Sequence, residues 1–311
     1  MPRHFLIDTD TASDDAVALV MALHYPDVQI EAITIVAGNV PLDQAVQNAL
    51  YTVELCRKDI PVHSGLSAPL TRPLQTAQYV HGQDGMGDIG LPLNGRSPAS
   101  NEAVRILIET IHQFSGDLTL VTLGPLTNIA VALRHDPTIA DAVSQCIVMG
   151  GTGQGHGNIT PVGENNFWAD PEAAKVVFES GLPLKMVGWD VSRTVAVFDP
   201  QDTAALRALD TPFARFCADI QKALAQFALS TTHLPGFDLP DAIAMAIALD
   251  PAVVTRTHSC FVDIAAASPF CRGQSVVDHL HVTGNEPNTE VVLDAPREQF
   301  LRTLYDAVSP G

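Results

Sequence analysis

The chain has 311 residues, 46% of them hydrophobic, and a formal net charge of −18 at pH 7, because 35 Asp and Glu outnumber 17 Lys and Arg. No stretch concentrates the Lys and Arg that neutralise phosphates, so we expect no nucleic acid and no anionic membrane surface as a partner. The high apolar share, with only 6% aromatic residues, favours a globular α/β enzyme over a disordered or fibrous protein.

The cysteines and the apolar runs indicate where in the cell the protein is expected. Five cysteines occur without C-x-x-C spacing, and an odd number argues against a disulfide framework. We therefore expect reduced, mostly buried thiols and a cytoplasmic protein. The apolar run at residues 5–7 is too short for a secretory signal, and no window of 18 uncharged apolar residues predicts a transmembrane span.

Short apolar runs alternate with helical patterns, which is typical of parallel βαβ units. After a first strand at 5–7, Ser13 is the expected N-cap of a helix whose apolar residues recur with helical spacing from Ala16. Further strands are predicted at 30–36, 60–63, 118–122, 146–149 and 184–187, and further helices at 45–55 and from Thr127. Polar, Gly-rich stretches at 71–96 and 150–166 are expected to be functional or mobile loops.

The last third indicates shorter strands added at one edge of the sheet, at 259–264, 276–282 and 291–293, and a final helix at 297–308. No internal repeat and no Pro/Ser linker divides the chain. We therefore predict a single domain, residues 1–311, with an open, mostly parallel, Rossmann-like central sheet flanked by helices.

Acidic residues gather where the first strand ends, and ligands bind outside the carboxyl ends of strands in such sheets. Asp8 and Asp10 close the strand, and Asp14 and Asp15 open the helix. Two acids in a first turn commonly only complement the helix dipole. Asp10 shifts the interpretation, because the turn brings its carboxylate close to that of Asp15, and like charges about 4 Å apart repel by roughly 4 kcal/mol at an effective dielectric near 20. Such a cluster needs protonation or a cation, and oxygen ligands alone select Ca²⁺ or Mg²⁺.

Other strand ends carry polar groups too. Asp241 heads an apolar helix, where on its own it can be an ordinary N-cap or first-turn acid. Asn39, the backbone at 123–124 and the segments 157–158 and 164–166 also follow predicted strands. Their Asn and Glu side chains are either turn residues or hydroxyl ligands for a sugar.

These residues together resemble the inosine-uridine nucleoside hydrolase family of metal-dependent N-ribohydrolases. Residues 8–16, with the sequence DTDTASDDA, resemble the family signature D-T-D-P-G-x-D-D-A. The resemblance continues, in the family's order and approximate spacing to about residue 250, through Gly38-Asn39-Val40, His81-Gly82, Gly124-Pro125-Leu126-Thr127-Asn128, Met149-Gly150-Gly151, Glu164 with Asn166, Asp170-Pro171-Glu172-Ala173-Ala174, and Asp241.

The resemblance implies hydrolysis of ribonucleosides to free base and ribose, in nucleoside salvage, by a homodimer or homotetramer. It implies a Ca²⁺ that binds the ribose 2′- and 3′-hydroxyls and a water, which Asp10 deprotonates. The implied ligands are Asp10, Asp15, the Leu123 carbonyl and Asp241. The implied ribose contacts are Asp14, Asn39, Asn158, Glu164 and Asn166, with Met149 lining the site and His81 near the base.

The chain departs from the family pattern at three places. Thr11-Ala12 replaces Pro-Gly, and Pro240 stands before Asp241 where many members carry a His proposed to protonate the leaving base. His81, ranked first, and His233 and Asp238, all in expected loops, are the alternative proton donors, unless the base leaves as an anion. Trp168 and Trp189 either stack on a purine or serve as packing residues. The third departure is a consequence of Pro240: base preference does not transfer from the family.

Other functions remain open at this point. The same chemistry would serve a modified-base or nicotinamide riboside, and Pro240 also allows a non-catalytic nucleoside or pentose-binding protein. A haloacid-dehalogenase-type phosphatase is disfavoured. Asp14 and Asp15 fit metal chelation of a diol better, and no Lys like that family's appears at a later strand end.

Overall fold

A nine-stranded sheet runs through the molecule in the order β10-β9-β11-β6-β5-β4-β1-β2-β3. The structure is a computed structural model that describes residues 2–232 and 234–309. The strands are β1 (Arg3–Thr9), β2 (Val28–Ile35), β3 (Val62–Ser64), β4 (Leu118–Thr122), β5 (Val143–Met149), β6 (Leu184–Val187), β9 (Arg256–Ala265), β10 (Gln274–Asp278) and β11 (Thr289–Asp294). All neighbours pair in parallel except β9, which is antiparallel to β10 and β11. The mostly parallel sheet with strands added at one edge is therefore confirmed.

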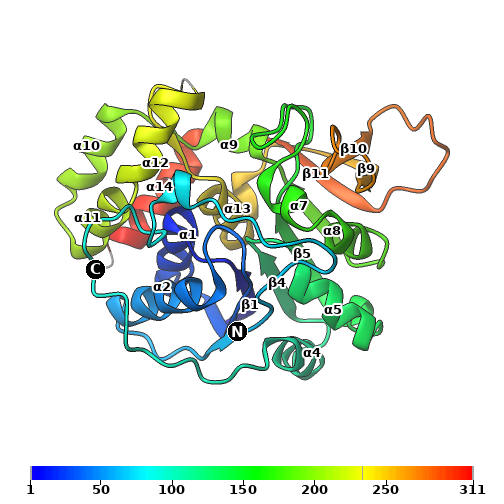
Figure 1. Ribbon diagram of the computed structural model, residues 1–311, viewed down its shortest axis with the longest axis horizontal. Coiled ribbons are helices and arrows are strands. Elements are labelled where there is room, and N and C mark those ends of the chain that lie inside the picture. The colour runs from blue at the N-terminus through cyan, green and yellow to red at the C-terminus, as the bar shows by residue number, and fades with distance from the viewer. Residues whose placement is uncertain (1, 233, 310–311) are drawn as a thin grey trace.

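Helices cover both faces of the sheet (Figure 1). One face packs against α1 (Ser13–His24), α2 (Leu42–Leu55), α13 (Pro240–Leu249) and α14 (Arg297–Val308), and the other against α4 (Ala103–Gln113), α5 (Thr127–His135), α6 (Ile139–Ala142) and α8 (Pro171–Phe178). Successive residues of β1 point to opposite faces, so Phe5 and Ile7 enter the first core and Leu6 the second. The carboxyl halves of β1 and β5 are consecutive buried residues because both faces of the sheet are covered there.

Short elements lie between the sheet strands and over the carboxyl edge. They are α3 (Gln78–His81), α7 (Asn165–Ala169), α9 (Trp189–Val195), α10 (Pro200–Ala208), α11 (Pro212–Asp219), α12 (Lys222–Phe227), the π-helical turn η1 (Ala228–Thr232), the 3₁₀ turn η2 (Pro251–Val253), and a two-stranded sheet of β7 (Val197–Phe198) and β8 (Phe237–Asp238). The loop positions expected for His81 and Asp238 are thus wrong, because His81 ends α3 and Asp238 lies in β8.

Two local predictions also need correction. Ser13 is the first helical residue of α1, and Ala12 is its N-cap, because the Asp15 carboxylate accepts the Ala12 N–H at 2.9 Å and caps the helix from within. The strand expected at 276–282 ends at Asp278, because the Asp278 carboxylate accepts the N–H groups of Val282 and Thr283 and turns the chain.

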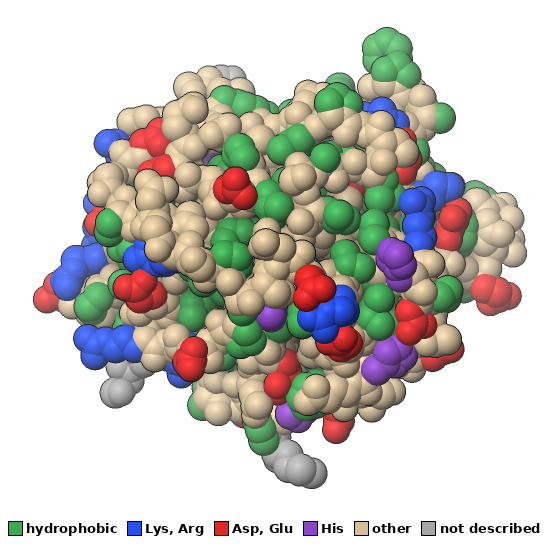
Figure 2. Space-filling model, turned by 60° about the horizontal axis from the view of Figure 1, so that its bottom comes forward, with side chains coloured by type: hydrophobic (Ala, Val, Ile, Leu, Met, Phe, Trp, Pro, Cys, Tyr) green, Lys and Arg blue, Asp and Glu red, His purple; other side chains and the backbone are tan. Residues whose placement is uncertain are grey.

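The surface and the thiols fit the composition. On the face shown in Figure 2, Lys and Arg lie scattered among Asp and Glu and form no basic patch. Four of the five cysteines are buried, Cys271 is half-buried, and all five are free thiols, as predicted. Within the described ranges, no helix is long and apolar enough to span a membrane.

Candidate active site

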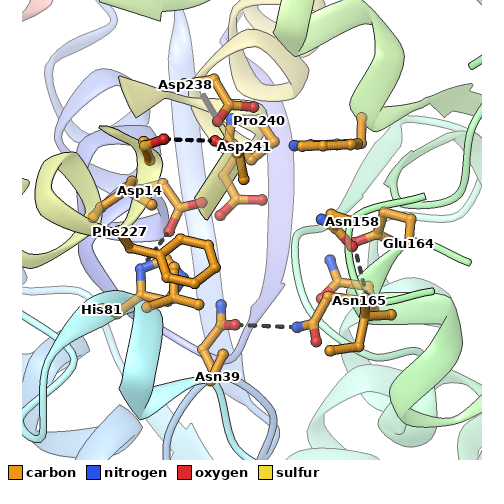
Figure 3. A pocket seen from close by; sticks show the side chains of 18 of the residues that line it. Asp14, Asn39, His81, Asn158, Glu164, Asn165, Phe227, Asp238, Pro240 and Asp241 are labelled. Atoms are coloured by element: carbon orange, nitrogen blue, oxygen red, sulfur yellow. Dashed lines mark hydrogen bonds and ion pairs between the residues drawn. The ribbon is translucent and has the colours of Figure 1, made fainter. Parts of the chain in front are cut away.

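A cavity opens at the carboxyl edge of the sheet (Figure 3). Nine of the eleven residues implied by the resemblance line it: Asp14, Asn39, His81, Leu123, Met149, Asn158, Glu164, Asn166 and Asp241. The other two, Asp10 and Asp15, are fully buried among these residues. The topology explains the convergence, because β1 lies between β2 and β4, and the segments that follow these strands meet at one edge.

The Asp10 carboxylate sits in a narrow socket between the ends of β2 and β4. Its Oδ2 accepts the backbone N–H of Asn39 at 2.6 Å. A Cβ added at Gly38 would lie 2.1 Å from this oxygen, and one added at Gly124 would lie 2.7 Å from Oδ1. Both distances are shorter than a non-bonded contact allows, so glycine at these two places is what lets the Asp10 carboxylate fit.

The turn between β1 and α1 tolerates the unusual Thr11-Ala12. Ala12 has φ −112°, a conformation open to any residue, so no glycine is needed there. The Ala12 N–H binds Asp15 Oδ2, and the Thr9 hydroxyl donates to Asp15 Oδ1 at 2.6 Å. The first departure from the family pattern thus leaves the Asp15 carboxylate held at both oxygens.

Four carboxylates converge here. One oxygen from each of Asp14, Asp15 and Asp241 lies within 4.8 Å of the others. Burial, and next the charge of Asp15, raise the pKa of Asp10 well above its usual range, and the same two causes act on Asp241. Burial raises the pKa values of Asp14 and Asp15 to about 6.

Two oxygens of this cluster have no hydrogen-bond partner among the described residues. They are Oδ1 of Asp10 and Oδ1 of Asp14, and both are buried. A buried acceptor without a partner costs about 1–3 kcal/mol. A divalent cation would bind the unpartnered oxygens and offset the repulsion between the carboxylates. Because all the donors are oxygens, they fit a hard ion. The residues present therefore fit a metal site.

The opposite wall of the cavity is built on Glu164 and Asn166. Glu164 accepts the N–H groups of Gly151 at 2.9 Å and Asn166 at 2.8 Å, and burial raises its pKa to about 7. The Asn166 amide donates to the Leu123 carbonyl at 2.7 Å and to the Met149 carbonyl at 3.3 Å. This network joins the ends of β4 and β5 to α7, so these polar groups are held at fixed positions around the cavity.

Asn165 is a cavity residue that the sequence analysis included in the polar segment 164–166 but that the resemblance did not assign to the site. Its amide donates to Asn39 Oδ1 at 3.2 Å, which joins the two sides of the cavity (Figure 3). The only sequence signal was its place between Glu164 and Asn166, and that run by itself does not say which of two adjacent Asn faces the site.

Two of the three residues considered as proton donors, His81 and Asp238, line the cavity. His81 Nδ1 lies 3.0 Å from Ser13 Oγ and 3.6 Å from Asp14 Oδ1, and burial lowers the pKa of His81 to about 4. Asp238 also lines the cavity, where it accepts the Ser192 hydroxyl at 2.7 Å, and burial raises its pKa. His233 lies outside the described residues.

Aromatic side chains form the outer part of the cavity. Phe227 at the end of α12 and Tyr79 of α3 meet edge to face at 5.7 Å, and sequence reasoning pointed to neither. Trp189 lines the cavity but is 95% buried, with the Arg193 guanidinium 4.7 Å from its ring. Trp168 is not among the described lining residues and packs under Arg272, so the packing interpretation holds for it.

Comparisons with known proteins identify the family. The family described as inosine-uridine preferring nucleoside hydrolase matches residues 5–302. The pyrimidine-specific ribonucleoside hydrolase RihA of Salmonella schwarzengrund is 35% identical over 308 residues, 98% of each protein. RihB of Escherichia coli, also named pyrimidine-specific, is 36% identical over 307 residues, 98% of this chain and 97% of RihB.

Solved structures agree with this result. A plant nucleoside hydrolase has a TM-score of 0.93 at 31% identity and covers the whole of both chains. A purine-preferring ribonucleoside hydrolase from Gardnerella vaginalis has a TM-score of 0.91, also at 31% identity, over 99% of this chain and 98% of that one. The chain belongs to the inosine-uridine preferring nucleoside hydrolase family and is a nucleoside N-ribohydrolase, which hydrolyses ribonucleosides to base and ribose.

Proposed function

We propose that the cavity at the carboxyl edge of the sheet is the active site of this hydrolase and that pyrimidine ribonucleosides are its preferred substrates. The observation that carries the assignment of the site is the convergence of Asp10, Asp14, Asp15 and Asp241, buried and with unpartnered oxygens, at the floor of that cavity. The base preference is supported by relatives at 35–36% identity that are named pyrimidine-specific.

The metal that we propose is Ca²⁺, held by the carboxylates of Asp10, Asp15 and Asp241 and by the carbonyl of Leu123. When bound, Ca²⁺ would orient the ribose diol and a water and lower the pKa of that water. Asp10 would accept the proton of the attacking water. Its socket holds one oxygen on the Asn39 N–H and leaves Oδ1 without a partner, so this oxygen is the one available for the proton.

The ribose is proposed to bind between the two walls of the cavity. Asp14, Asn39, Asn158, Glu164 and Asn166 would receive its hydroxyls, and Met149 would pack beneath the ring. Cleavage passes through a ribosyl cation, which nearby carboxylates and amide oxygens stabilise. This explains why the walls carry acids and amides and why, among the described lining residues, no Lys or Arg is found.

Pro240 occupies the place of the family's proposed acid, lines the cavity and has no proton to give. We infer that His81 assists departure of the base. Because the lowered pKa keeps its imidazole neutral at pH 7, His81 would act as a hydrogen-bond donor to the leaving base. Asp238 is the second candidate because it lines the same cavity.

We also propose that residues 1–311 form one domain, since the family match extends over residues 5–302. A homodimer or homotetramer in the cytoplasm, acting in nucleoside salvage, completes the proposal. Assembly is supported by apolar side chains near the β9–β10 edge, Phe270, Leu280 and Val282, which are 80% or more exposed. Light scattering that finds only monomer would contradict the oligomer.

The test is a panel of uridine, cytidine, inosine, guanosine and nicotinamide riboside, with release of reducing sugar as the readout and Ca²⁺ present. We expect the largest kcat/KM with uridine or cytidine. A higher value with purine nucleosides would refute the base preference, and a higher value with nicotinamide riboside would establish the alternative substrate. The non-catalytic alternative has no support from the comparisons, since the relatives described are named hydrolases.

A further inference from the structure

A second group of metal-ligand side chains lies away from the cavity, at the edge of the sheet. His258 and Cys260 are two residues apart on β9 and so point to the same face. In the antiparallel pairing of β9 with β10, Asp278 stands opposite Phe261, so the next residue, His279, comes beside Cys260. One ligand atom from each of His258, Cys260 and His279 lies within 4.8 Å of the others.

The distances from His279 Nδ1 to the other two donor atoms match those around one tetrahedral ion. His279 Nδ1 is 3.4 Å from His258 Nδ1 and 3.7 Å from Cys260 Sγ. With Zn–N bonds of about 2.05 Å and Zn–S bonds of about 2.3 Å, tetrahedral geometry separates two nitrogens by about 3.3 Å and a nitrogen from a sulfur by about 3.6 Å. His279 is therefore placed to share one ion with His258 and Cys260, whose own ligand atoms lie within 4.8 Å of each other.

The hydrogen bond that His279 makes on the side of its ring away from His258 and Cys260 determines which of its nitrogens can bind a metal. His279 Nε2 lies 2.8 Å from the Gly153 carbonyl oxygen. A carbonyl only accepts, so Nε2 carries the hydrogen, and the neutral ring then presents the lone pair of Nδ1 to His258 and Cys260. Metal-binding histidines are typically oriented in this way, by donating their other N–H to a carbonyl or carboxylate.

We propose that His258, Cys260 and His279 bind a transition-metal ion, with Zn²⁺ as the expected ion, at a site separate from the carboxylate cluster. Thiolate and imidazole select borderline-soft ions, whereas the all-oxygen cavity selects hard ones. Three protein ligands leave the fourth position of a tetrahedral ion to a water, and His281, whose ring centroid lies 5.6 Å from that of His258, is outside the three-residue cluster. On binding, the Cys260 thiol loses its proton to solvent and the thiolate sulfur binds the ion.

The site's place in the fold indicates a structural role. Gly153 lies at the base of the loop from Gly150 to Asn166, which carries Asn158 and Glu164. Next to it, Thr152 exchanges two hydrogen bonds with the Ser275 hydroxyl of β10, at 2.7 and 2.8 Å. An ion that fixes His279 would therefore hold the base of this loop against the β9–β10 hairpin.

The test uses Co²⁺ as a probe, on the full-length protein with Ca²⁺ in excess so that the oxygen site is filled. A thiolate-to-Co²⁺ charge-transfer band in the near ultraviolet requires a cysteine ligand. We expect one equivalent of Co²⁺ to produce this band and Zn²⁺ to displace it. Its absence at saturating Co²⁺ would overturn the proposal.

Variants assign the ligands. Cys260→Ser and His279→Gln are expected to lose the band and to weaken Zn²⁺ binding at least tenfold. Cys271→Ser, on the same hairpin but outside the cluster, is the matched control and should keep both. Circular dichroism checks that each variant is folded, and His279→Gln serves if Cys260→Ser does not fold. A band that survives in the Cys260 variant, or that disappears in the Cys271 variant, would refute the assignment.

Discussion

At the scale of single residues, the site depends on small neighbours as much as on charged groups. Asp10 is implied by the family signature, but its environment is created by Gly38 and Gly124, where a side chain would overlap the carboxylate. The signature contains the acids, whereas the socket comes from two other strands. The resemblance includes the Gly-Asn and Gly-Pro motifs but gives no reason for their glycines. The structure supplies the reason, because it places both glycines against the Asp10 carboxylate.

Replacing Asp10 by Asn should remove the proton acceptor while leaving the fold intact. The amide oxygen can still accept the Asn39 N–H, and loss of the charge relieves repulsion within the cluster. We expect kcat/KM to fall about 10²–10⁴-fold, the usual contribution of a general base, with an unchanged circular dichroism spectrum. Activity within threefold of the wild type would show that another group takes the proton.

Gly38→Ala tests the socket. The new methyl would lie 2.1 Å from Asp10 Oδ2 and 2.8 Å from Pro125 Cδ, so either the carboxylate or the loop must move. We predict at least a tenfold loss of kcat/KM and a loss of about 1–3 kcal/mol in unfolding free energy. Gly181→Ala is the control, because its φ of +84° is strained for alanine but its surroundings are open. That variant should lose about 1 kcal/mol of stability and keep its activity.

At the scale of elements, the sequence predicts the parallel sheet well and the covering segments poorly. The strands β4 and β6 and the helix α14 have the predicted bounds, because each strand is a short, mostly apolar run and the helix is a regular amphipathic repeat. No element from α9 to β8 was predicted. These pieces are short, so no period repeats often enough to identify them, and their positions depend on packing over the carboxyl edge.

The segments that were not predicted include those that we expect to contact the base. The α3 and α12 segments bring Tyr79 and Phe227 to the cavity from distant parts of the chain, and Phe227 lies on the same side of the cavity as His81 (Figure 3). The carboxylate and amide residues could be inferred because a long signature contains them. The aromatic wall could not, because no strand end or motif marks it.

We expect Phe227→Ala to raise KM for the preferred nucleoside about tenfold and to change kcat by much less. An aromatic contact with a base contributes about 1–3 kcal/mol to binding, and we expect this wall to hold the base in both the ground state and the transition state. Phe213→Ala removes a half-buried aromatic from α11 outside the cavity and serves as control. An equal fall in kcat and kcat/KM with unchanged KM would instead place Phe227 in the chemical step.

At the scale of the whole molecule, folding brings carboxylates together in a buried place, where their negative charges repel and are not solvated. Burial raises the pKa values of Asp10, Asp14, Asp15 and Asp241 at the junction of α1, α13 and the sheet, and the charges of neighbours within this cluster raise those of Asp10, Asp15 and Asp241 further. The overall acid excess of the chain gave no hint of this, because most acids are ordinary surface groups. A bound cation would replace this repulsion by attraction and so stabilise the contact between the elements that meet there.

Removing Ca²⁺ should therefore affect activity and stability together. Dialysis against a calcium chelator is expected to abolish sugar release and to lower the midpoint of thermal unfolding. Adding Ca²⁺ back to 100 times its Kd should restore activity and add about 2.7 kcal/mol of unfolding free energy. Full activity after chelation, with metal analysis confirming removal, would rule out the calcium assignment.

The central claim is that the carboxylate cluster recognises the ribose through its vicinal hydroxyls. The most direct measurement is kcat/KM for uridine against 2′-deoxyuridine, which differ only in one of those hydroxyls. We predict at least a 100-fold preference for uridine, because the deoxy sugar leaves buried polar groups of the site unpaired. Comparable values for the two substrates would contradict the account.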